Sequence, residues 1–233
     1  MSVIGTVAGL WRYPVKSMAG EELAETEVSW HGLAGDRRWA FIRDGQVRNG
    51  FPWLTLRQRP DLVGYQPSFA EPDRPDRSVT LVRTPSGRVL DVADPELAAE
   101  LGDGLRLLKQ DRGCFDTLPL SLLSTQTMAG LGALVGAGLD VRRFRPNLVV
   151  RAAGEVAFPE DTWVGAVLRI GGLRMRVDAR DVRCAVVTVD PETGARDKTI
   201  LGTINAFRDR CVGVYGTTVA PGRVAVGDPV SLD

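Results

Sequence analysis

The side chains that could most clearly bind a ligand or take part in a reaction are two arginines, a lysine and a cysteine. They lie far apart in the chain. They occur in the segments Tyr13-Pro14-Val15-Lys16-Ser17, Gly35-Asp36-Arg37-Arg38-Trp39, Arg145-Pro146-Asn147 and Arg183-Cys184. Arginine presents a planar fork of donors that matches phosphate oxygens, and lysine adds a compact positive charge. An isolated arginine is more often a solvated surface charge. If Lys16, Arg37 and Arg145 converge in the fold, however, the sequence predicts a local phosphate site.

The cysteine at position 184 allows two interpretations. A lone cysteine at the start of an apolar run is ordinarily a small buried hydrophobic residue. Here Arg183 and Arg180 are close in sequence, and nearby cations favour the thiolate, which binds soft metals or attacks sulfur donors. Cys114 and Cys211 stand in no comparable segment, so we expect both to be structural.

The overall composition narrows the classes of function. The chain of 233 residues has 29 Lys and Arg against 29 Asp and Glu, so no net positive charge points to nucleic acid as a partner. It contains no basic leader and no apolar run of about 18 residues, which predicts no membrane span and a cytoplasmic location. The 3 separated cysteines suit a reducing compartment, and with 1 histidine they cannot build the common zinc or iron–sulfur sites.

Short strands are expected to position these segments. Residues 23–30 alternate apolar and polar side chains, the period of two that a half-buried strand shows. The two glycines between residues 168–170 and 173–175 supply the positive φ angles of a hairpin turn. Residues 71–76 are typical of a polar, proline-rich loop. Further strands are predicted over residues 3–13, 38–42, 78–82 and 88–92.

Helices are expected to be few. Asp94 offers an N-cap, Pro95 fits the first helical position, and Gly102 ends the short helix that follows. Residues 124–134 and 198–207 are two further candidates, the first capped by Ser124 or Thr125. The prediction is therefore a mainly β chain with a few helices, an α+β fold.

The region near Arg112-Gly113 is the predicted boundary, or seam, between two halves of the chain. We expect one unit over residues 1–112 and another over residues 113–233. A continuous β structure that crosses this seam is as plausible as two independent domains.

The same segments resemble a known family. Together with Asp190-Pro191-Glu192-Thr193-Gly194 and Gly227-Asp228-Pro229-Val230, they are similar to the MOSC family, named for the C-terminal domain of molybdenum-cofactor sulfurase, and most of all to its amidoxime-reducing branch. The resemblance implies an N-terminal MOSC β-barrel module over residues 1–112 and a MOSC β-barrel domain over residues 113–233.

The resemblance also implies roles for single residues. Cys184 corresponds to the cysteine that binds molybdenum, and so to the catalytic residue. Tyr215 resembles a tyrosine near the metal. The residues implied in holding the molybdenum cofactor, through its pterin (molybdopterin) and phosphate, are Lys16, Ser17, Arg37, Arg145 and Asn147.

The implied activity is the reduction of N-hydroxylated small molecules, such as amidoximes, hydroxylamines and N-oxides. The sequence shows neither the membrane anchor of mitochondrial relatives nor the cysteine-rich ferredoxin domain of some bacterial ones, so electrons are expected from a separate ferredoxin- or cytochrome-type protein. Met18 and Val182 replace a cysteine and a serine of the mitochondrial relatives, which leaves substrate preference open. The alternative is a carrier, in which Cys184 holds a persulfide or passes sulfur or the molybdenum cofactor to a client without turnover.

Overall fold

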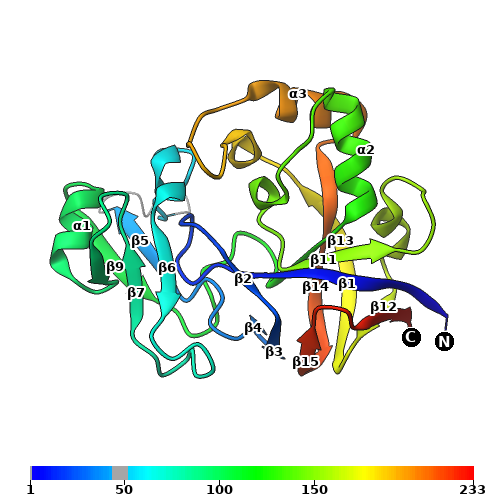
Figure 1. Cartoon of the computed structure of the whole chain (residues 1–233), viewed down its shortest axis with the longest axis horizontal. Coiled ribbons are helices and arrows are strands. Elements are labelled where there is room, and N and C mark those ends of the chain that lie inside the picture. The colour runs from blue at the N-terminus through cyan, green and yellow to red at the C-terminus, as the bar shows by residue number, and fades with distance from the viewer. Residues whose placement is uncertain (1, 44–51) are drawn as a thin grey trace.

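The computed structural model describes residues 2–43 and 52–233, and its larger unit is a closed barrel (Figure 1). Seven strands form the ring in the order β11-β10-β14-β13-β12-β16-β1, and β1 closes it by pairing with β11. β2 (Glu21–Leu23) extends the sheet beyond β1. The ring strands are β1 (Val3–Arg12), β10 (Leu120–Ser124), β11 (Leu148–Ala152), β12 (Val167–Ile170), β13 (Leu173–Val182), β14 (Cys211–Ala220) and β16 (Pro229–Leu232).

Alternating side chains fill the barrel. On β13, Leu173, Met175 and Val177 point inward while their neighbours are more exposed, as the period of two requires. The predicted hairpin is confirmed, because Ile170 of β12 pairs with Leu173 of β13. Only Gly171 takes a positive φ there, at 53°, so one of the two glycines, and not both, provides the left-handed conformation.

A second, smaller β unit packs beside the barrel and carries its own core, on the left in Figure 1. Its strands are β5 (Trp39–Arg43) paired with β9 (Leu105–Lys109), and the sheet β6 (Gln66–Phe69), β7 (Thr80–Arg83) and β8 (Val89–Asp91). The core includes Phe41, Leu62, Val82, Leu97 and Leu101. A further small sheet joins β3 (Glu25–Ser29), β4 (Gly32–Leu33) and β15 (Gly222–Ala225).

The three predicted helices are confirmed. In α1 (Pro95–Leu101) the Asp94 side chain accepts from Glu96 N. In α2 (Thr125–Val135) the Ser124 hydroxyl accepts from Thr127 N, and the helix ends at a left-handed Gly136. α3 (Lys198–Phe207) has the predicted bounds. Short 3-10 helices complete the secondary structure of the described residues: η2 (Pro60–Gly64), η3 (Val141–Phe144), η4 (Pro159–Trp163) and η5 (Ala185–Thr188).

The strand predicted over residues 23–30 is only partly right. The strand is interrupted between β2 and β3. In β3 the buried positions are Thr26 and Val28. The predicted alternation puts Trp30 on the same face, but Trp30 lies in a turn and its side chain is 62% exposed. The reason is that β3 ends at Ser29 and turns directly into β4, so the alternation does not continue.

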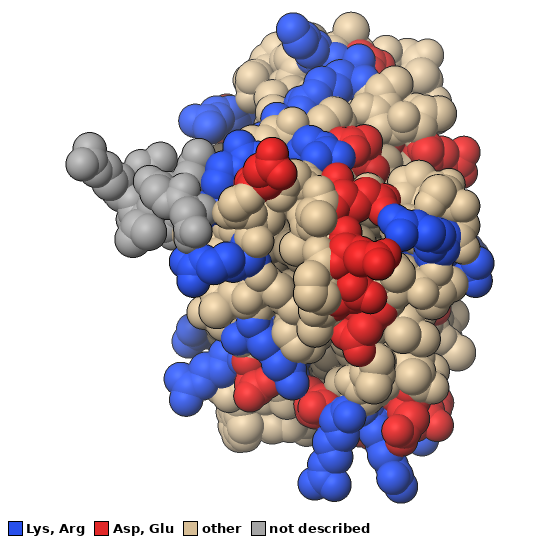
Figure 2. Space-filling view, turned by 90° about the vertical axis from the view of Figure 1, so that its left-hand side faces the viewer, with Lys and Arg blue, Asp and Glu red and all other residues tan. Residues whose placement is uncertain are grey.

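Strands from the two halves of the chain pair with each other in the same sheets. β1 of the first half pairs with β11 and β16 of the second half, and β15 near the C-terminus pairs with β3. β structure therefore crosses the predicted seam, and the boundary between residues 112 and 113 stays a prediction. On the face shown in Figure 2, acidic side chains gather in a vertical band flanked by basic ones, so this face is not uniformly positive.

Within residues 2–43 and 52–233, none of the helices has the length and apolar character needed to cross a membrane. The cytoplasmic location inferred from the sequence stays a prediction.

Candidate functional site

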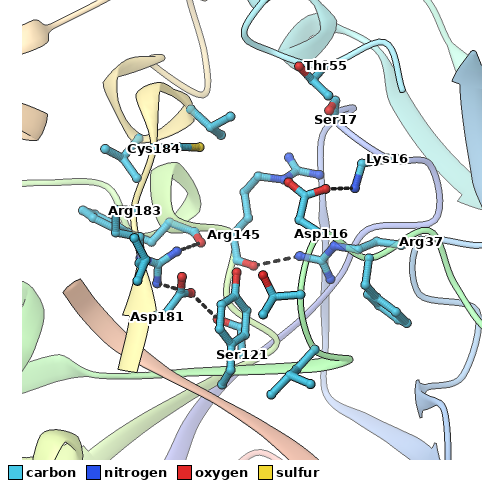
Figure 3. Close-up of a pocket in the computed structure, with 18 of the residues that line it drawn as sticks. Lys16, Ser17, Arg37, Thr55, Asp116, Ser121, Arg145, Asp181, Arg183 and Cys184 are labelled. Atoms are coloured by element: carbon cyan, nitrogen blue, oxygen red, sulfur yellow. Dashed lines mark hydrogen bonds and ion pairs between the residues drawn. The ribbon is translucent and has the colours of Figure 1, made fainter. Parts of the chain in front are cut away.

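A pocket of about 330 Å³ lies where side chains of both halves of the chain meet. Figure 3 shows lysine and arginine side chains from the first half facing arginine and cysteine side chains from the second. The residues that the sequence predicted for the metal and the cofactor all line this one pocket: Lys16, Ser17, Arg37, Arg145, Asn147, Cys184 and Tyr215. The structure thus brings together four segments that are far apart in sequence, while the roles of the residues stay predictions.

Lys16 enters the pocket just after β1. Its backbone N donates to Trp39 O at 2.8 Å, which ties the segment to β5. Its Nζ donates to Cys114 O at 2.6 Å and forms an ion pair with Asp116. Burial lowers the pKa of Lys16, and Asp116 opposes that shift. Cys114 and Asp116 thereby hold the partly desolvated Lys16 ammonium group at the pocket wall.

Arg37 is fixed by a buried carboxylate. Asp36 pairs with it, and the same carboxylate accepts from Tyr13 N at 2.7 Å and from Asn147 Nδ2 at 3.1 Å. Burial alone would lower the pKa of Arg37, but the neighbouring Asp36 raises it. Arg37 Nη2 also donates to Arg145 O at 3.0 Å, so the two arginines are joined directly (Figure 3).

Arg145 has a hydrogen-bond donor that finds no acceptor among the residues that the structure describes. Its Nη1 donates to Met18 O at 2.7 Å, but its Nη2 is buried without a hydrogen-bond partner. The guanidinium stacks on the ring of Tyr13, 4.2 Å from its centroid. Burial, with repulsion from Arg37, lowers the pKa of Arg145 to about 10. A buried donor without an acceptor is costly, and an anion in the pocket would satisfy it.

Unusual backbone conformations mark the same residues. Ser17, Arg37 and Arg145 have φ angles of 69°, 49° and 53°, in the left-handed region that side chains other than glycine rarely adopt. Such positions persist only where the surrounding structure enforces them, and they cluster at functional sites. Their occurrence at three pocket residues supports the interpretation of this pocket as the functional site.

Asn147 serves the framework of the pocket. Its Oδ1 accepts from Ser121 N at 3.2 Å, and its Nδ2 donates to Trp11 O and to Asp36. Because these bonds engage both ends of the amide, Asn147 ties β1 and β10 to the carboxylate that holds Arg37. Direct contact between Asn147 and a cofactor stays a prediction.

Cys184 lies half-buried at the start of η5, and the cation beside it is not one that the sequence indicated. Its Sγ accepts a hydrogen bond from Arg57 Nη2 at 3.1 Å. Arg183, expected to influence the thiol, is buried and donates to Val212 O and Phe144 O. Arg180 pairs with Asp161 instead. No local signal could reveal Arg57, because it lies 127 positions from Cys184.

Asp181, three positions before Cys184 in the sequence, forms a buried ion pair with Arg183. It is 1% exposed, and its Oδ2 lies 2.9 Å from Arg183 Nη2 and accepts from Ser121 Oγ at 3.3 Å. Burial raises the pKa of Asp181, and Arg183 opposes the shift. Burial and the nearby Asp181 carboxylate raise the pKa of Tyr215 to about 12, so its phenol is neutral at physiological pH. Figure 3 shows Asp181, Arg183 and Ser121 on the side of the pocket away from Lys16.

We expect Asp181→Ala to lower the free energy of unfolding by about 3–5 kcal/mol, because it leaves the buried Arg183 guanidinium without its counter-charge. Urea unfolding at neutral pH measures this. The matched control is Glu25→Ala, which breaks the exposed ion pair with Arg223 and should change stability far less. Equal losses in the two variants would contradict the assigned importance of the buried pair.

Comparison with known proteins places the chain in a family. A model of the MOSC domain matches residues 110–231, and a model of the MOSC N-terminal beta barrel domain matches residues 4–102. Mitochondrial amidoxime reducing component 2 from Homo sapiens is 29% identical over 97% of this chain and 83% of its own. Mitochondrial amidoxime-reducing component 1 from Homo sapiens is 27% identical over 98% and 83%.

More distant similarities agree with this. Molybdenum cofactor sulfurase from Caenorhabditis elegans is 24% identical over 91% of this chain but only 33% of its own length. Among solved structures, the YUAD protein from Bacillus subtilis superposes with a TM-score of 0.50 at 11% identity, covering 97% of this chain and 93% of that one, which supports the fold alone. Since the MOSC model matches more than half of the sequence, the chain belongs to the MOSC domain family, with a MOSC N-terminal beta barrel domain in its first half.

Proposed function

We propose that this protein binds the molybdenum cofactor and reduces N-hydroxylated small molecules. The observation that carries the proposal is the single pocket in which the half-buried thiol of Cys184 meets the cations Lys16, Arg37 and Arg145. The relatives named as amidoxime-reducing components support the reaction class. The relative named as molybdenum cofactor sulfurase supports the link to that cofactor.

The residues present fit such a cofactor. Its phosphate needs buried cationic donors, and Arg145 Nη2 is one that has no acceptor among residues 2–43 and 52–233. Its metal needs a soft ligand, and Cys184 offers a thiol on the same pocket. Lys16 and Arg37 would contribute the remaining positive charge at the phosphate end.

When bound, the cofactor supplies the two-electron redox chemistry that cleaves the N–O bond. The chain's own contribution is positional. Arg37 and Arg145 would both contribute to phosphate binding, since the Arg37 side chain donates to the Arg145 backbone and the two residues therefore lie next to each other. Ser17 and Tyr215 line the pocket. Cys184 would hold the metal, and a separate ferredoxin- or cytochrome-type protein would supply electrons.

The second candidate is a carrier of sulfur or of the cofactor. It is favoured by the accessibility of Cys184, whose thiol is half-buried while Cys114 and Cys211 are buried. In that case a persulfide on Cys184 would pass to a client, and no small molecule would be turned over.

Molybdenum content and turnover together separate the candidates, because a carrier of sulfur would lack the metal and a carrier of the cofactor would hold it without turnover. Protein made in a host that synthesises the cofactor should contain close to one molybdenum atom per chain by elemental analysis, and should reduce an aromatic amidoxime with a chemically reduced viologen as electron source. Protein from a host unable to make the cofactor is the control and should do neither. A purified protein with a Cys184 persulfide, no molybdenum and no turnover would overturn the reductase and support the carrier.

A further inference from the structure

Arg57 reaches from the first half of the chain to the thiol of the second. Its side chain is 40% exposed, and its Nη2 lies 3.1 Å from Cys184 Sγ and 3.9 Å from Asp116 Oδ2. The Asp116 carboxylate is in turn held by Lys16. The guanidinium therefore lies between the thiol and the acid that neutralises the pocket lysine, at the rim of the same pocket.

The backbone that carries Arg57 is fixed from the opposite side. Arg196 Nη2 donates to Leu56 O at 2.9 Å and to Arg57 O at 3.0 Å. The turn is closed internally, because Arg57 N donates to Thr55 Oγ1 at 3.3 Å and Gln58 N donates to Thr55 O at 2.9 Å. Arg57 thus presents its guanidinium from a built turn anchored by the second half.

We propose that Arg57 is a positioning residue that holds the Cys184 sulfur and raises the reduction potential of a metal bound to it, and that Arg196 keeps Arg57 in place. This inference rests on the proposed function. A hydrogen bond and a positive charge at a ligating sulfur draw electron density from the metal–sulfur bond and favour the reduced metal. Partners of this kind, one step removed from the metal, are known to tune metal sites without touching the metal.

The test is a redox titration of the molybdenum-loaded protein, followed by electron paramagnetic resonance. Arg57→Ala should weaken molybdenum retention by no more than about tenfold to a hundredfold, and the loaded variant should show a lower potential and an altered molybdenum signal. Arg57→Lys should recover part of the shift, because the charge remains but the guanidinium geometry is lost. Arg196→Gln should shift the potential in the same direction by a smaller amount, since it frees only the backbone of Arg57.

The matched control is Arg59→Ala. Arg59 belongs to the same turn but pairs with Asp61 and donates to Leu101 O, so its removal should leave the potential unchanged. An Arg57→Ala protein with the parent's potential and signal would overturn the role of Arg57 and leave the proposed function standing. A parent that binds no molybdenum would overturn the proposed function, and this inference with it. Thermal unfolding of each variant shows that the fold is kept.

Discussion

Replacing Cys184 by alanine is expected to abolish N-reductase activity and to speed the loss of molybdenum. The variant keeps the cations that would hold the phosphate, so the pterin should still bind while the metal loses its only protein ligand in the proposal. Losing a residue one step removed from a metal typically costs about tenfold to a hundredfold, so loss of the ligand itself should exceed about a hundredfold. Amidoxime turnover and molybdenum content after gel filtration measure the two effects.

The other cysteines are the controls for that experiment. Cys114 is buried, and burial raises the pKa of its thiol to about 11. Lys16 contacts the backbone O of Cys114, which an alanine retains. Cys211 donates weakly to Asp209 O at 3.4 Å. Cys114→Ala and Cys211→Ala should therefore be mild, and full activity in Cys184→Ala would refute the metal-ligand assignment.

Local signals in the sequence were enough to predict the helices and many of the strands. The helix ends were readable because an Asp or Ser cap and a terminal glycine act through the adjacent backbone, as Asp94, Ser124 and Gly136 do here. Strand partners were not readable in this way. That β1 closes the barrel on β11 while also pairing with β16 depends on contacts across the whole chain.

The site shows the same division. The convergence of Lys16, Arg37 and Arg145 on one pocket, predicted from motif chemistry and family resemblance, is found in the structure. What the sequence could not reveal is how their charges are balanced. Asp116, which pairs with Lys16, belongs to no motif. Arg183 does not act on Cys184 as expected, because its side chain pairs with Asp181, which also belongs to no motif. Adjacency in sequence at the end of a strand does not give adjacency in space, since successive side chains point to opposite faces.

The largest effect on cofactor binding is expected from Arg145. Lys16 and Arg37 are partly neutralised by Asp116 and Asp36, whereas Arg145 Nη2 has no acceptor within the part of the chain that the structure describes. A charge-assisted contact is worth about 1.5–3 kcal/mol, which corresponds to roughly tenfold to a hundredfold in affinity. Arg145→Ala should reach the upper end of that range, and Lys16→Ala and Arg37→Ala the lower end. Cofactor occupancy and dissociation rate in the three variants measure this order.

The paired variants test whether these side chains share one ligand. Arg37 and Arg145 are joined by a 3.0 Å hydrogen bond, and both stack on the ring of Tyr13. Their combined truncation should therefore differ from the sum of the single losses, because residues with a common partner couple. Arg37→Lys should recover only part of the affinity, since a point charge cannot reproduce a two-pronged contact.

Arg142→Ala is the matched control for the phosphate prediction. Arg142 lies three positions before Arg145, but its guanidinium pairs with Asp140 and Glu192 and does not line the pocket. Its removal should leave cofactor occupancy unchanged. If Arg145→Ala retains the cofactor as well as Arg142→Ala does, with both proteins folded by thermal unfolding, the buried guanidinium does not bind the phosphate. The anion site would then be lost as support for the reductase, and the carrier role of Cys184 would be the better account of this pocket.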